Sequence, residues 1–101
     1  MTRRDALVQV IDCLHAEIAA LKANDTRALE RATAAKLGHI EAVAACEGEA
    51  LTDETRALAH EAQRLNETAR IYVNLMAANV RRRLQSLAGT AVAPYRAGAY
   101  A

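Results

Sequence analysis

Residues 52–87 carry the stretch TDETRALAHEAQRLNETARIYVNLMAANVRRRLQSL, which contains neither glycine nor proline. Apolar residues recur along it at steps of three and four, the spacing that places side chains on one stripe of an α-helix. At about 1.5 Å per residue such a helix reaches roughly 50 Å, far beyond the average globular helix, so it needs partners along its length. The stripe consists of Leu58, Ala62, Leu65, Ala69, Tyr72, Met76, Val80, Leu84 and Leu87.

The composition of the chain favours helices throughout. Of its 101 residues 52% are hydrophobic, yet there is no Trp and no Phe, and it holds four Gly and one Pro. Ala, Leu, Glu and Arg are strong helix formers, and Ala allows helices to approach closely. The sequence therefore predicts one all-α domain with a slim core.

A first helix is expected over about residues 3–23. Thr2 can cap its N-terminus, with Asp5 completing a short capping box. Its apolar residues alternate in steps of four and three, which suits nearly antiparallel packing against other helices. These residues are Leu7, Ile11, Leu14, Ile18 and Leu21.

A second helix is expected over about residues 26–46, after a turn at Asn24-Asp25-Thr26 in which Asp25 is the N-cap. Gly38 weakens this helix, and Gly48 is expected to end it in a left-handed conformation. Thr52 then caps the third helix, residues 52–88, which Gly89 is expected to stop. Residues 1–89 form the bundle domain, and residues 90–101 are expected to be a flexible tail.

These lengths predict an antiparallel three-helix bundle in which the third helix outruns the other two. A hairpin of two long helices remains the alternative if the chain does not break at Asn24-Asp25. We expect the first two helices to cover residues 52 to about 70. The uncovered remainder is the candidate partner-binding surface, since exposed apolar stripes mark interaction sites. It comprises Tyr72, Leu75, Met76, Val80, Leu84 and Leu87, joined in the tail by Tyr95 and Tyr100.

Several functional classes lack support in the sequence. No apolar run is long enough to span a membrane, and polar residues interrupt the N-terminal segment too often for a signal peptide. The net charge of +1 is not that of a nucleic-acid binder, although the triplet Arg81–Arg83 leaves that class as a minor alternative. Glu17, Glu30, Glu41, Glu61 and Glu67 are spaced like exposed helix charges.

Catalytic and metal-binding patterns are also missing. Cys13 and Cys46 lack CxxC spacing, so we interpret them as buried thiols in a cytoplasmic protein rather than as a disulfide or redox pair. His39 and Cys46 could share a helix face, but structural zinc sites need four ligands. We predict a protein that is not an enzyme and that uses no metal and no cofactor.

Two segments and the tail resemble the FlgN-type flagellar export chaperones, with the FliT-type chaperones as near relatives. Residues 20–43 are similar to that family's Leu, Asn/Gly-Asp turn, Leu and Lys pattern, and residues 65–87 to its Leu-Asn, Asn-Leu-Leu and Arg-Arg helix. Tyr95 and Gly98 match its C-terminal Tyr-x-x-Gly element. The matching helical positions are Leu21, Asp25, Leu29, Lys36, Leu65, Asn66, Asn74, Leu75, Met76, Arg82, Leu84 and Leu87.

The resemblance implies a cytoplasmic, non-enzymatic chaperone of type III export. Such a protein binds the C-terminal helices of hook–filament junction proteins and delivers them to the export gate, which the tail would contact. A homodimer is compatible with this role. The alternative is a structural or adaptor module that oligomerises, as a coiled coil, through the same stripe.

Overall fold

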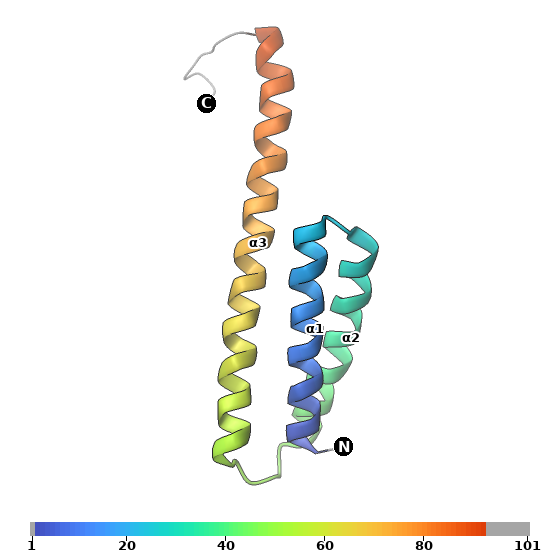
Figure 1. Cartoon of the computed structure of the whole chain (residues 1–101), viewed down its shortest axis with the longest axis vertical. Helices are drawn as coiled ribbons and strands as arrows, with labels where there is room; N and C mark the ends of the chain where they lie inside the picture. Colours follow the sequence, from blue (N-terminus) through green and yellow to red (C-terminus); the bar gives the residue numbers. More distant parts are fainter. Residues whose placement is uncertain (1, 93–101) are drawn as a thin grey trace.

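The computed structural model describes residues 2–92, and it folds them into three helices. These are α1 (Arg3–Ala23), α2 (Thr26–Ala45) and α3 (Asp53–Val92), and no strand occurs among the described residues. The chain runs up α1, down α2 and up α3, so that α1 and α3 are parallel and α2 is antiparallel to both (Figure 1). The expectation of an all-α bundle is confirmed.

Helix α1 is the centre of the bundle, because it packs against both α2 and α3 whereas α2 and α3 make no close backbone approach to each other. The prediction that two helices cover the first half of α3 was therefore wrong: α1 alone lies along it. Above the α1–α2 turn, α3 continues without a neighbour (Figure 1). This gives the molecule its elongated dimensions of 61 × 25 × 18 Å.

The hydrophobic core is as thin as the composition predicts. Val10 and Leu14 of α1 and Leu65 of α3 form its centre. Ile11, Ile18, Ala62 and, from α2, Val43 pack against them while staying partly exposed. Among the described residues, only Leu14 is a large side chain with less than 2% of its surface exposed.

The chain does break at Asn24, so the two-helix alternative is wrong. Asn24 has φ 56° and ψ 41°, the left-handed conformation that Asn tolerates better than most residues. Its N–H donates to the carbonyl of Leu21 over 3.2 Å, and the N–H of Asp25 donates to that of Ala20 over 2.9 Å. This pair of bonds is the Schellman pattern that ends a helix. Asp25 Oδ1 then accepts from the N–H of Ala28 at 3.0 Å and starts α2, as predicted.

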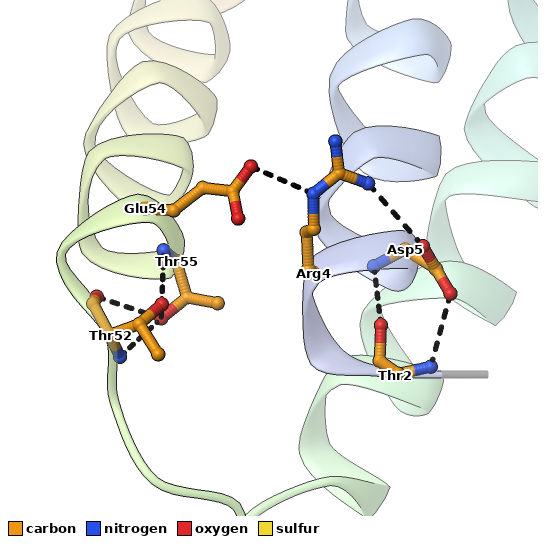
Figure 2. Close-up of polar contacts among 6 residues, drawn as sticks. All are labelled: Thr2, Arg4, Asp5, Thr52, Glu54 and Thr55. Atoms are coloured by element: carbon orange, nitrogen blue, oxygen red, sulfur yellow. Dashed lines mark hydrogen bonds and ion pairs between the residues drawn. The ribbon is translucent and has the colours of Figure 1, made fainter.

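At the opposite end of the bundle, paired caps fix the starts of α1 and α3 (Figure 2). Thr2 Oγ1 accepts from the N–H of Asp5 at 3.1 Å, and Asp5 accepts in return from the N–H of Thr2 at 3.4 Å. Thr52 and Thr55 exchange the same two kinds of bond, at 3.1 and 3.0 Å. Arg4 Nε donates to Glu54 Oε2 at 2.8 Å and so links the two capped ends. Both predicted N-caps are confirmed.

Arg3 is buried, although arginine side chains are mostly exposed in folded proteins. Its guanidinium donates to the carbonyl of Cys46 at 2.6 Å, and its backbone N–H donates to Glu49 at 3.2 Å. The guanidinium thus adds a cationic donor at the C-terminal end of α2, to a carbonyl that also accepts from the N–H of Glu49 at 3.0 Å. Gly48 does not have a positive φ, so the predicted left-handed cap at that position was wrong.

Helix α3 runs on to Val92, past the expected stop at Gly89. A glycine inside a helix costs only about 0.5–1 kcal/mol relative to alanine, and no proline occurs before Pro94. Nothing at Gly89 therefore forces the helix to end. Of the expected tail, residues 90–92 are helical, and residues 93–101 lie outside the described part of the chain.

Glu17 was expected to be an exposed charge, but only 4% of its surface is accessible. It lies on the apolar seam of α1, where α2 covers it. Thr33 Oγ1 donates to one carboxylate oxygen at 2.7 Å, and Lys36 Nζ donates to the other at 3.0 Å. Buried charges persist where they are paired and hydrogen-bonded, so this cluster fixes how α1 and α2 face each other.

Replacing Lys36 by Met should lower the free energy of unfolding by about 2–3 kcal/mol, because the buried Glu17 carboxylate loses its cation. Adding Glu17→Leu should restore stability to within about 1 kcal/mol of the parent, since two apolar residues then pack together. Urea denaturation followed by circular dichroism measures both. Arg70→Met is the control, because it breaks the exposed Glu67–Arg70 pair and should cost less than about 0.5 kcal/mol. If Lys36→Met and Arg70→Met lowered the free energy of unfolding equally, the Glu17 cluster would have no structural role.

Candidate partner-binding surface

The cover on α3 ends where α1 ends. Lys22, in the last turn of α1, places its ammonium 5.6 Å from the centre of the Tyr72 ring, a cation–π contact. One turn further along α3, Met76 lines a small cavity of about 20 Å³ with Leu21 and Leu29. Tyr72 and Met76 are consequently half-buried. The exposed surface therefore begins after Met76 and not at Tyr72.

We call residues 77–92 of α3 the overhang. Up to Gly89 its large apolar side chains are Val80, Leu84 and Leu87, which are 55%, 61% and 75% exposed. At about 100° per residue they continue the line of Leu65 and Met76 that packs toward α1 lower down. The apolar stripe of α3 thus continues into the overhang, where α1 no longer covers it.

Leu75 is also exposed, at 59%, but it does not belong to this stripe. It lies about 100° around the helix from Met76, close to the face that carries Ile71, which is 50% exposed. The stripe therefore holds Tyr72, Met76, Val80, Leu84 and Leu87. Leu75 lies beyond the Tyr72 edge of this stripe, at least 120° around the helix from Val80, Leu84 and Leu87. Tyr95 and Tyr100 lie outside the described residues.

A hollow of about 280 Å³ lies where the overhang leaves the bundle. Leu21 and Asn24 of the α1–α2 turn form one side of it, and Met76, Val80 and Arg83 are among the α3 residues that form the other. A helix lying along the overhang stripe would end against this turn. The hollow is therefore one end of the candidate surface.

The charge of the chain changes sign along its length. All twelve acidic residues lie within residues 1–67, together with eight of the thirteen basic ones. Residues 68–101 hold five arginines and no Asp or Glu, which gives formal charges of −4 and +5 for the two parts. Arg81 and Arg83 flank the Val80–Leu84 stripe on opposite sides at about 100° per residue. An acidic helix would therefore suit the overhang better than a basic one.

Neither cysteine is in a disulfide, and both are partly exposed rather than buried as expected. Partial burial, followed by the nearby Asp12 and Glu17 carboxylates, raises the pKa of the Cys13 thiol. Burial also raises the pKa of the Cys46 thiol, and a hydrogen bond with Glu49 raises it further. An activated nucleophile needs the opposite shift.

Within residues 2–92 no three His, Cys, Asp or Glu side chains are grouped closely enough to hold a metal ion. No helix in this part of the chain combines the length and the apolar run that a bilayer crossing requires.

Two features of this surface were not predicted from the sequence. The charge reversal after Glu67 was available from the order of residues alone, but the overall net charge of +1 conceals it. The Lys22–Tyr72 contact has no local sequence signal, because it depends on how far α1 reaches along α3.

Comparisons with protein-family models, with curated proteins and with solved structures gave no match to this chain.

Each thiol should alkylate more slowly at pH 7.5 than an unperturbed cysteine, because a raised pKa leaves less thiolate at that pH. The Cys46→Ala variant reports on Cys13, and Cys13→Ala reports on Cys46. Iodoacetamide rates measured from pH 7 to 10.5 should reach half of their maximum at a higher pH than N-acetylcysteine in the same buffers. A midpoint below that of N-acetylcysteine for either protein thiol would show that the thiol is activated, against this account.

Proposed function

We propose that this protein is a helix-binding chaperone that receives an amphipathic helix of a client protein along its overhang. The observation that carries this proposal is the line of Val80, Leu84 and Leu87, each more than half exposed on one face of a helix that projects beyond its bundle. An apolar stripe of this kind favours docking by the apolar face of another helix.

The half-buried residues at the base of the overhang support the same proposal. Tyr72 and Met76 form the end of the covered stripe, next to the hollow at the α1–α2 turn. A client helix lying on the overhang would continue the line of α1, and its end would meet Leu21 and Asn24. Met is unbranched and polarisable, so Met76 can adapt to different client side chains.

The specific role proposed is that of a FlgN-type flagellar export chaperone in the cytoplasm. The resemblance in residues 20–43 and 65–87 suggests the C-terminal helices of hook–filament junction proteins as clients. Two of the matching positions, Leu84 and Leu87, lie on the exposed stripe. In this proposal the tail, with Tyr95 and Tyr100, contacts the export gate while the overhang holds the client.

The double variant Val80→Glu with Leu84→Glu should abolish client binding and keep the helical fold, because both side chains are exposed and outside the core. We expect the dissociation constant for the C-terminal helical segment of a junction protein from the same genome to rise by about 100-fold or more in titration calorimetry. Val80 is preferred to Met76 here because Met76 contributes to the cavity at the turn.

The matched control is Ile71→Glu with Leu75→Glu, which adds the same charge to the same helix on a different face. Its affinity should stay within about threefold of the parent. Equal loss in both variants would show that the stripe is not the docking surface. A parent chain that binds no junction-protein helix, and whose self-association survives a large excess of such peptides, would instead favour the oligomerising module.

A further inference from the structure

An apolar groove opens between α2 and α3 because α1 keeps these two helices apart. Leu7, Val10 and Leu14 of α1 form its floor, and two adjoining hollows of about 250 and 670 Å³ share Leu7, Val43 and Ala59 in their walls. Its rims carry exposed apolar side chains, since Ile40 is 45% and Leu51 is 61% exposed. This groove is distinct from the overhang and no described residue covers it.

One face of α3 serves both the groove and the overhang. Ala59, Ala62 and Asn66 line the groove, and at about 100° per residue they share a sector of about 60° with Val80 and Leu84. The groove wall on α3 is centred on the small residues Ala59 and Ala62, with Gln63 and Asn66 at one end, whereas the overhang stripe consists of large residues. The two halves of α3 are thus complementary in shape along a single face.

Length and charge match as well. The groove wall from Thr55 to Asn66 extends about 17 Å, and the stripe from Val80 to Leu87 needs about 11 Å. The part of the chain that contains the groove has a formal charge of −4, whereas the overhang contains Arg81–Arg83 and no acidic residue. Opposite charges favour packing of the overhang against the bundle of another copy, and like charges disfavour packing of two overhangs against each other.

We propose that two copies of this chain form a two-fold dimer in which the overhang of each lies in the α2–α3 groove of the other. A chain cannot fill its own groove, because α3 is one continuous helix and holds Val80 about 21 Å beyond Asn66. Antiparallel pairing of two α3 helices about their midpoint brings Leu84 and Leu87 to the level of Ala59 and Ala62. The arrangement closes after two copies, as a two-fold interface must.

The dimer also accounts for Val73, which is 48% exposed near the midpoint of α3. Val73 lies in the same sector as Ala62 and Val80, so the two-fold axis would place it against Val73 of the partner subunit. This inference does not rest on the proposed function. If both hold, the partner copy and a client helix exclude each other, because they need the same stripe.

Light scattering after size exclusion tests the dimer on the full-length chain. The parent should have twice the chain mass of 10.9 kDa at tens of micromolar protein. Leu84→Glu in the overhang and Ala59→Arg in the groove should each raise the dimer dissociation constant about tenfold or more, because each buries a charge without a partner. The matched controls Ile71→Glu and Ala57→Arg lie on exposed faces outside both surfaces and should leave the constant within about threefold. Circular dichroism confirms that each variant is folded.

Salt dependence and the comparison of the variants distinguish a dimer that pairs overhang with groove from one that pairs overhang with overhang. Added salt should weaken the dimer, because the attraction joins opposite charges. A parent chain that stays monomeric at several hundred micromolar would overturn the proposal. A second contradictory result is a dimer that Leu84→Glu disrupts but that Ala59→Arg and added salt leave intact or strengthen. That result would show that the two overhangs pair with each other. Neither outcome decides whether a monomer binds a client helix, which the calorimetric titration measures separately.

Discussion

The structure depends on one mismatch, between a strong stop signal in the first half of the chain and its absence in the second. Asn24 in the left-handed conformation and the Asp25 cap end α1 and begin α2, so each of these helices is about 30 Å long. No comparable signal occurs between Thr52 and Val92, and α3 is 40 residues long. The overhang is the direct product of this difference in length.

The same mismatch divides the stabilising interactions unevenly. The core around Leu14, the Glu17 cluster and the clasp between Arg4 and Glu54 all lie along the length of α1. Residues 77–89 of the overhang take part in none of these contacts and depend on helix propensity, which stabilises a short helix only marginally in water. Covering its apolar stripe with another helix would stabilise it by burying that surface. The proposed client complex and the proposed dimer would both be stabilised by burying this exposed apolar surface.

Helix caps and helical periodicity could be predicted from the sequence, whereas contacts between distant segments could not. Thr2, Asp25 and Thr52 act as caps within three residues of themselves, so their roles followed from residue type and position. The alternation of the α1 seam and the uncovered stripe on α3 followed from helical periodicity. Gly48 and Gly89 misled, because a glycine permits a helix end without requiring one.

The burial of Arg3 and Glu17 depends on which carbonyl and which cation α2 brings near them. The groove exists only because α1 lies between α2 and α3, which no periodicity encodes. The candidate surface was thus predicted in outline, while the Lys22–Tyr72 boundary, the separation of Leu75 and the second surface required the fold.

No described residue covers the apolar stripe of the overhang, so we expect a helix of another chain to bury it. Hydrogen exchange of backbone amides tests it most directly, by comparing residues 80–89 with residues 58–69 in the same sample. In dilute protein the overhang amides should exchange about 100-fold faster than the bundle amides, and added client peptide or rising protein concentration should slow the overhang selectively. Overhang amides that are as protected as the bundle in dilute monomer, or that stay unprotected at high concentration and with saturating client peptide, would contradict the account.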